Sequence, residues 1–353
     1  MFWAKSKNLV GLDIGSSAVK VVELKPLSKG RGYELINIGI ESIPPECIVD
    51  GSIMDAGMVI DAIQRLWDEN KIKNQNVATS VSGNAVIIKR ITVSAMSDEE
   101  LAGSIQWEAE QYIPFDIADV NLSYQILEGV ETKESSMEVR LVAVKKDKSN
   151  EYTRVISQAG KIPMVMDVDA CAIQNAYEAN YEISTSEVVA LVNIGSSVTN
   201  VSVLKDGMSV FWRDLTIGGH NYTDAIQREL GLPYEQADLL KKGAPQGDVS
   251  PENAQPVLQT VTEEMGNEVQ KTMDFFKTTT ADVAVDRIML SGGGCKIPGL
   301  QDYLQDRFDC TVEMLNPLNK IKINEKDFEV ETIQQISSDV AVAVGLALRK
   351  ANA

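Results

Sequence analysis

The sequence predicts an α/β protein made of two related lobes, with a small α/β insert in the first lobe. Two observations support this prediction. A strand–turn–strand pattern occurs twice, at residues 9–24 and 189–204, with Ile-Gly-Ser-Ser at both turns. A glycine run at 292–294 follows a short apolar strand and precedes a helix. A repeated motif indicates two units of common design, and a glycine run between strand and helix lets a ligand approach the backbone.

The two copies of the repeated pattern also match in their polar residues. Their strands are rich in Val, Ile and Leu, which is typical of strands buried in a sheet. Asp13 and Asn193 stand at equivalent strand ends, and Gly15 and Gly195 follow at equivalent turns. Serines after such a glycine leave N–H groups free to hold an anion. Either copy alone is equally compatible with an ordinary hairpin, but two copies favour two phosphate loops that face a nucleotide in a cleft.

Hydrophobic patterning extends the first lobe beyond its hairpin. The segment 33–40 is predicted to be a third strand, and 53–71 has the apolar spacing of an amphipathic helix. Two further strands are predicted at 77–81 and 86–93. The second of these strands leads into the insert.

The insert is predicted to occupy about residues 85–165. Ser97 and Glu100 have the spacing of a capping box, which predicts a helix that runs to about residue 112 and stops at Ile-Pro-Phe, 113–115. The remaining insert elements are two strands and a helix, predicted at 124–129, 137–144 and 149–159.

The second half is predicted to alternate strands with longer helices. A strand at 164–169 leads into a helix that runs through residue 177, before the second hairpin. After that hairpin the sequence predicts helices at 218–230, 233–242 and 251–277, a strand at 286–290, a helix that opens at 298–300 and a last helix at 337–350.

Charge and composition argue against several functions. The 353 residues contain 33 Lys and Arg against 51 Asp and Glu, a net charge of −18, which argues against nucleic acid and anionic lipid as general partners. The four cysteines are scattered and fit reduced thiols of a cytosolic protein. The only histidine is His220, which excludes a histidine metal cluster. No apolar run reaches the roughly 18 residues of a membrane span.

The order of the glycine-containing motifs resembles that of the actin-like ATPase superfamily. Residues 13–20, 193–199 and 291–294 fall on its two phosphate hairpins and its adenosine loop, and 237–241 looks like the helix that approaches the ribose and base in bacterial actin homologues. The resemblance implies an actin-like (ribonuclease H-like) two-lobed ATPase fold with an FtsA-type extra small subdomain.

Within the superfamily, the chain is most similar to the PilM family of type IV pilus assembly. The more specific stretches are 108–115 and 167–170. The implied subdomains are 1A at 1–84, 166–187 and 337–353, 1C at 85–165, 2A at 188–225 and 283–336, and 2B at 226–282.

The resemblance implies that the cleft binds ATP with Mg²⁺. Asp13 and Asn193 occupy the metal positions, where Mg²⁺ takes few carboxylates and keeps its waters. Asp238 stands where the family commonly has Glu. Lys20 points at the phosphates or is a solvated strand lysine. The implied nucleotide-binding residues are Gly15, Ser16, Ser17, Lys20, Gly195, Ser196, Ser197, Gly218, Gly219, Asp238, Lys241, Gly292, Gly293 and Lys296.

Asn193 departs from the superfamily pattern, which usually has Asp at this position to orient Mg²⁺ and the attacking water. An amide cannot accept a proton as a carboxylate does, and it brings no charge to the metal. We therefore expect ATP binding with slow or absent hydrolysis, and no catalytic residue is assigned.

The resemblance also implies partners and a location. The implied partners are the N-terminal cytoplasmic tail of PilN, the pilus platform and its motor proteins. The implied location is the cytoplasm, peripheral at the inner membrane. Residues 113–115 either border a peptide groove beside the insert or are internal packing. A homo-oligomer is left open. The alternatives are an FtsA-like, membrane-associated polymerising division protein and an active ATPase or kinase of the superfamily.

Overall fold

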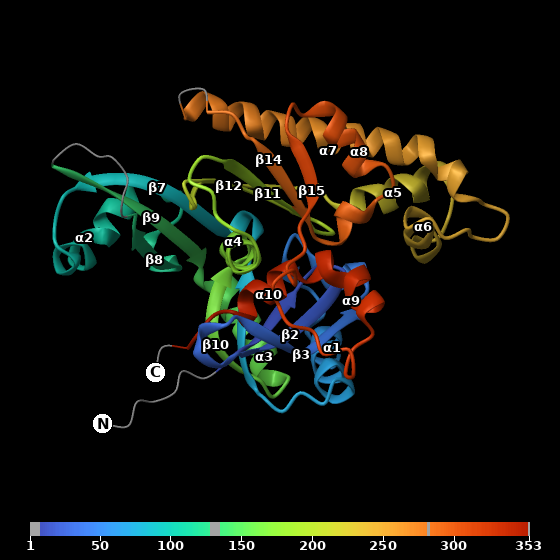
Figure 1. Ribbon diagram of the computed structural model, residues 1–353, viewed down its shortest axis with the longest axis horizontal. Helices are drawn as coiled ribbons and strands as arrows, with labels where there is room; N and C mark the ends of the chain where they lie inside the picture. The colour runs from blue at the N-terminus through green and yellow to red at the C-terminus, as the bar shows by residue number, and fades with distance from the viewer. Residues whose placement is uncertain (1–7, 128–134, 281–282, 352–353) are drawn as a thin grey trace.

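The computed structural model describes residues 8–127, 135–280 and 283–351, and the fold consists of two lobes and an insert (Figure 1). Each lobe contains a five-stranded sheet of the same design. The first sheet has the order β10-β6-β1-β2-β3, and the second has the order β13-β12-β11-β14-β15. In both, a hairpin and a third antiparallel strand lie on one side, and two parallel strands lie on the other. The shared topology confirms two related halves.

The strands of the first sheet are β1 (Val10–Ile14), β2 (Ala18–Pro26), β3 (Tyr33–Ser42), β6 (Asn76–Val81) and β10 (Ile162–Val168). Those of the second are β11 (Val188–Ile194), β12 (Thr199–Lys205), β13 (Met208–Leu215), β14 (Arg287–Ser291) and β15 (Thr311–Met314). A small hairpin, β4 (Ile48–Val49) and β5 (Ser52–Ile53), precedes the first helix.

Helices form three layers around the two sheets. The outer face of the first sheet packs on α1 (Ala56–Glu69) and α3 (Lys146–Gln158). The apolar cluster between the sheets contains α4 (Asp169–Asn180) and α10 (Ala341–Ala347). The outer face of the second sheet packs on α5 (Gly219–Leu230), α6 (Tyr234–Lys241), α7 (Pro251–Thr279) and α8 (Leu300–Arg307). The two sheets are therefore joined through one shared pair of helices (Figure 1).

Glycines let this central helix pair approach its neighbours at backbone distance. A Cβ at Gly345 of α10 would lie 1.7 Å from the carbonyl oxygen of Ala172 in α4. A Cβ at Gly11 of β1 would lie 1.9 Å from the carbonyl oxygen of Ala343. Real Cβ atoms cannot occupy such positions, so α10 can seat against both α4 and β1 only because these residues are glycine.

The insert forms a separate sheet, β7-β9-β8, made of β7 (Val86–Ser94), β8 (Val120–Ile126) and β9 (Ser136–Lys145). Its own apolar core includes α2 (Asp98–Glu110), and the Ser97–Glu100 capping box is present as predicted. The sheet ends at Lys145. The residues beyond it, predicted to belong to the insert, instead form α3, which packs on α1, and β10, which pairs with β6 of the first sheet.

Several predicted boundaries differ from the structure. The helix predicted at 53–71 begins after its N-cap Asp55, whose side chain accepts the backbone N–H of Met58. The last predicted helix, 337–350, is a short 3₁₀ turn followed by α10. The elements that were not predicted include the small hairpin of β4 and β5, the strands β13 and β15, and α9 (Val330–Ile336). The predicted strand end at residue 129 lies outside the described residues. No described helix is both long and apolar enough to cross a membrane.

Candidate functional site

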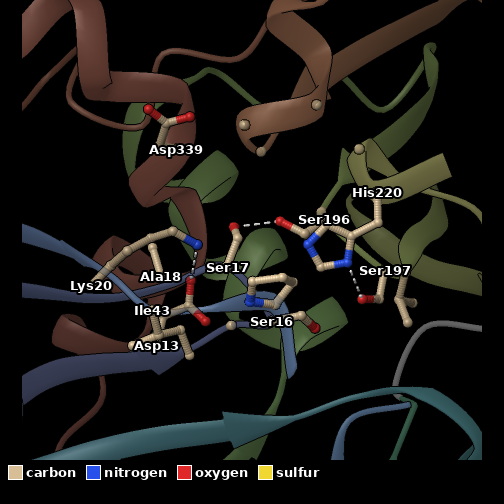
Figure 2. Close-up of a pocket in the computed structure, with 18 of the residues that line it drawn as sticks. Asp13, Ser16, Ser17, Ala18, Lys20, Ile43, Ser196, Ser197, His220 and Asp339 are labelled. Atoms are coloured by element: carbon tan, nitrogen blue, oxygen red, sulfur yellow. Dashed lines mark hydrogen bonds and ion pairs between the residues drawn. The ribbon is translucent and has the colours of Figure 1, made fainter. Parts of the chain in front are cut away.

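A cleft of about 1100 Å³ lies between the two lobes. Both Ile-Gly-Ser-Ser turns line it, together with the start of α5, the helix α6 and the glycine run after β14. Ser196 of the second turn donates a hydrogen bond from Oγ to Ser17 Oγ of the first, so the two turns face each other directly (Figure 2). Apart from Gly218, every residue predicted to bind nucleotide or metal lines this cleft.

The two turns have the same backbone geometry. The N–H of Gly15 donates to the carbonyl oxygen of Ala18 at 3.1 Å, and the N–H of Gly195 donates to the carbonyl oxygen of Val198 at 2.9 Å. A Cβ at Gly195 would lie 2.8 Å from that oxygen, so the turn needs glycine there. Consecutive backbone N–H groups in a turn of this kind are suited to hold an anion.

Lys20 and Asp13 form an ion pair at the edge of the first turn. They are cross-strand neighbours on β2 and β1, and Lys20 Nζ lies 2.9 Å from Asp13 Oδ2. Burial alone would lower the pKa of Lys20, but the carboxylate of Asp13, helped by those of Asp339 and Asp169, raises it above its usual value. Lys20 is therefore charged and held at the cleft wall, and is not a freely solvated strand lysine.

Asp169 is a cleft residue that the sequence analysis did not assign to the site. It is the first residue of α4 and accepts a hydrogen bond from Ser80 Oγ at 2.6 Å. Burial, and then the nearby charge of Asp13, raise the pKa of Asp169 to about 6. The available signal was its place at the end of the strand predicted at 164–169, within the family-specific stretch 167–170.

Asn193 is held at both ends of its amide. Its Nδ2 donates to Asn200 Oδ1 at 3.1 Å, and its Oδ1 accepts from Ser291 Oγ at 3.1 Å. Asn200 in turn donates to Asp214 Oδ1 at 2.8 Å, and Asp214 Oδ2 accepts the backbone N–H of Gly83 at 2.7 Å. This chain of hydrogen bonds links the floor of the cleft to the first lobe at the base of the insert.

The start of α5 contains Gly218 and Gly219, two of the residues predicted to bind nucleotide, but its first N–H groups are bonded within the second lobe. The N–H of Gly219 donates to the carbonyl oxygen of Gly195 at 2.9 Å, and that of His220 donates to the carbonyl oxygen of Ser196 at 2.7 Å. A Cβ at Gly218 would lie 2.6 Å from the Gly195 oxygen. The glycine pair therefore lets the start of α5 approach the second turn closely and hydrogen-bond to its backbone. Gly218 itself does not line the cleft.

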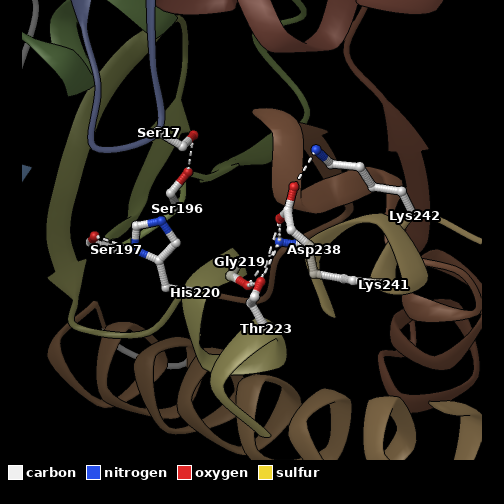
Figure 3. Close-up of polar contacts among 9 residues, drawn as sticks. All are labelled: Ser17, Ser196, Ser197, Gly219, His220, Thr223, Asp238, Lys241 and Lys242. Carbon is white, nitrogen blue, oxygen red and sulfur yellow. Dashed lines mark hydrogen bonds and ion pairs between the residues drawn. The ribbon is translucent and has the colours of Figure 1, made fainter. Parts of the chain in front are cut away.

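Asp238 and Lys241 belong to a polar network that joins α6 to α5 (Figure 3). Lys241 Nζ donates to Asp238 Oδ1 at 2.5 Å, to Thr223 Oγ1 at 2.8 Å and to the carbonyl oxygen of Gly219 at 3.2 Å. Burial lowers the pKa of Lys241 although Asp238 opposes this. In Asp238 burial acts to raise the pKa, but the charges and hydrogen bonds of Lys241 and Lys242 lower it overall.

The glycine run after β14 brings the backbone of the second lobe close to the cleft floor. Gly292 has φ +84°, and a Cβ there would lie 2.4 Å from the carbonyl oxygen of Ile194. Lys296 Nζ bonds to Asp339 Oδ2 and to the carbonyl oxygen of Gln335, which ties this loop to the segment leading into α10. Asp339 was not predicted as a cleft residue.

The cleft residues fit a bound magnesium nucleotide. Among residues 8–127, 135–280 and 283–351 no three His, Cys, Asp or Glu side chains form a metal cluster. Mg²⁺ needs no such cluster, because it takes one or two carboxylates and completes its shell with waters and phosphate oxygens. Asp13 supplies a carboxylate beside the first turn, whereas the amide of Asn193 is already engaged on both sides.

Comparisons with known proteins agree with the observed geometry. A family model described as type IV pilus assembly protein PilM matches residues 11–351. Among solved structures, the chain is similar to a PilM–PilN type IV pilus biogenesis complex, with 28% identity, a TM-score of 0.87 and 98% of each chain covered. MreB5 of Spiroplasma citri bound to ADP shares the fold, with 13% identity, a TM-score of 0.53, and 97% of this chain and 95% of that chain covered.

A curated relative is more distant. The chain is 25% identical over 259 residues to the cell division protein FtsA of Bacillus subtilis, which covers 66% of this chain. The match spans 57% of the length of that FtsA. The fold expected from the sequence, an actin-like two-lobed architecture, is confirmed by these similarities.

Proposed function

Because the chain belongs to the type IV pilus assembly PilM family, we propose that it is an ATP-binding scaffold of the pilus assembly platform. It holds Mg²⁺–ATP between its two lobes, hydrolyses it slowly or not at all, and binds the N-terminal tail of PilN beside its insert. It acts in the cytoplasm at the inner membrane and connects the platform to the motor proteins.

The facing turns give this proposal its main support. Ser17 and Ser196 come from lobes that are far apart in sequence, yet their hydroxyls are in contact across the cleft. Two such turns that face each other across the cleft, with Lys20 beside the first, carry the kinds of donor that a polyphosphate needs, namely backbone N–H groups, hydroxyls and an ammonium group. A phosphate group that enters between the turns replaces the contact between Ser17 and Ser196, so that both lobes bind the same ligand.

The direct test is titration of the purified full chain with Mg²⁺–ATP by calorimetry. We expect saturable binding of one nucleotide with a dissociation constant in the micromolar range. If the protein takes up no ATP, ADP or AMP at millimolar concentration, the proposal fails.

Asn193→Asp is expected to raise the rate of ATP hydrolysis. The wild-type amide cannot take a proton, and turnover should stay well below about 1 s⁻¹, the low end for typical enzymes. A carboxylate at this position can accept a hydrogen bond from the hydroxyl of Ser291 and orient a water. We expect about a tenfold gain in turnover, which is below the roughly 10²–10⁴-fold of a fully positioned general base. Phosphate release under saturating Mg²⁺–ATP measures this.

Asn200→Asp is the matched control for this substitution. It adds the same charge at the hydrogen-bond partner of Asn193, where the new carboxylate faces Asp214, and it should not raise turnover. Wild-type turnover at or above about 1 s⁻¹ would contradict the proposed slow hydrolysis.

The tail of PilN is proposed to bind as an extended peptide between the insert and the first lobe. β8 and β10 are edge strands of their sheets, and an edge strand can pair with an added peptide. β10 exposes Ile162 and Met164. Phe115 leads toward β8 and is half-buried, with Lys145 Nζ 4.2 Å from its ring centroid, whereas Ile113 is buried in the insert core.

Phe115→Ser is expected to weaken binding of a synthetic PilN tail at least tenfold, because about 1.4 kcal/mol of apolar contact is enough for that change. Fluorescence anisotropy measures the affinity, and thermal unfolding measures stability. Trp107→Ser is the control, because Trp107 is another aromatic residue of the same insert and its side chain is 73% exposed. A lower melting temperature with unchanged peptide affinity would show that Phe115 is only internal packing.

A further inference from the structure

His220 is the only histidine of the chain, and its imidazole is bonded on one side only. Nδ1 lies 3.2 Å from Ser197 Oγ of the second turn. Nε2 has no hydrogen-bond partner within the described part of the chain, and it has almost no contact with solvent. Figure 2 shows the ring beside the second turn, with one nitrogen on Ser197 and the other directed toward the first turn.

The surroundings keep this imidazole neutral. Burial lowers the pKa of His220, and the charge of Lys241 lowers it further, against the weaker opposing charges of Asp224 and Asp238. The ring also packs edge-on against Tyr234, with centroids 6.1 Å apart. A neutral imidazole has one N–H donor and one acceptor nitrogen. If the Ser197 hydroxyl donates to Nδ1, the proton is on Nε2, on the side of the first turn.

A buried N–H without an acceptor is unfavourable, and a ligand that supplies the acceptor relieves this cost. Building on the proposed nucleotide binding, we propose that His220 is a phosphate-binding residue, whose Nε2–H donates to a β- or γ-phosphate oxygen held between the two turns. Ser197 is the positioning residue that fixes the proton on Nε2. The side chain thereby replaces the α5 backbone N–H groups, which are already bonded to the second turn.

Two substitutions separate the two nitrogens of the ring. His220→Gln places an amide N–H near the position of Nε2, whereas His220→Asn reaches only as far as Nδ1 and can bond Ser197. We expect His220→Asn to weaken ATP and ADP binding about tenfold, the usual effect of losing a hydrogen bond to a charged group, and His220→Gln to retain most of the affinity. AMP, which has no β- or γ-phosphate, should bind all three proteins alike.

These titrations distinguish the inference from the function on which it rests. If the wild type binds no nucleotide, the proposed function fails. If the wild type binds ATP and both variants bind it equally well, the assignment of His220 is wrong while the proposed function stands. Equal weakening of ATP binding and AMP binding by His220→Asn would also overturn the assignment of His220, because that pattern indicates general damage to the cleft.

A spectroscopic test follows from the presence of one histidine. In tag-free protein labelled with ¹⁵N-histidine, the imidazole gives a single pair of ring nitrogen signals, which report the tautomer directly. We expect Mg²⁺–ATP to leave a single Nε2–H tautomer and to shift the Nε2 signal, and AMP to cause a much smaller shift. An Nδ1–H tautomer in the ATP complex, or ring signals that ATP leaves unchanged, would rule out the proposed contact.

Discussion

Gly345→Ala is expected to lower the free energy of unfolding by about 3 kcal/mol, at the upper end of the usual cost of overpacking. The added methyl would lie 1.7 Å from the carbonyl oxygen of Ala172 and 2.4 Å from its carbonyl carbon. Backbone atoms cannot turn aside, so α10 must move away from α4 and disturb the apolar layer that joins the two sheets. Chemical denaturation followed by circular dichroism measures the change.

Gly103→Ala is the matched control, because Gly103 is also inside a helix but a Cβ there meets nothing within 4 Å. Alanine has the higher helix propensity, so this variant should gain about 0.5–1 kcal/mol. The two glycine-to-alanine substitutions are therefore expected to change the free energy of unfolding in opposite directions. A stabilised Gly345→Ala protein would mean that α10 does not seat on α4 as described.

Gly218→Ala is expected to reduce nucleotide affinity about 100-fold, equivalent to about 2.7 kcal/mol, while leaving most of the fold intact. The added Cβ would lie 2.6 Å from the carbonyl oxygen of Gly195 and 2.7 Å from that of Ser196. The start of α5 must then withdraw, and the N–H groups of Gly219 and His220 lose their acceptors. Because those bonds fix the backbone of the second turn, the turn would lose the position in which it binds a phosphate.

The control for this variant is Gly57→Ala at the start of α1, where a Cβ approaches only the side chain of Asp55, at 3.3 Å. Its nucleotide affinity should equal that of the wild type. Calorimetry compares the three proteins, and thermal unfolding without nucleotide checks that each is folded. Undiminished nucleotide affinity in folded Gly218→Ala would show that the hydrogen bonds between α5 and the second turn have no part in binding.

Much of the fold could be predicted from one repeated motif. Two Ile-Gly-Ser-Ser hairpins imply two sheets of one design, and the structure has that design in full. Two of the missed elements, β15 and α9, carry weak local signals. β15 is a four-residue edge strand with one buried residue, and α9 has seven residues with only Ile333 buried. Their structure depends on contacts with distant parts of the chain, which no short window of sequence contains.

The predicted residues on the repeated turns line the cleft, whereas several cleft residues that come from elsewhere in the chain were not predicted. Asp169 and Asp339 are brought to the cleft by the central helix layer, and Tyr234 by α6. Nothing in the local sequence marks Tyr234 or Asp339 as a neighbour of the turns, and the one signal for Asp169 is its place at the end of a predicted strand. Gly218 was predicted to bind nucleotide but does not line the cleft, for a related reason. A glycine pair before a helix fits a phosphate site, but which acceptor takes its N–H groups depends on the tertiary packing.

The central claim is that the two turns, one from each lobe, hold one nucleotide between them. Hydrogen–deuterium exchange with and without saturating Mg²⁺–ATP tests it most directly, because it follows the backbone N–H groups of both turns separately. We expect slower exchange in peptides that contain residues 15–18 and in peptides that contain residues 195–198, with no change over α2 of the insert. Protection of one turn alone, or of neither, would contradict the account.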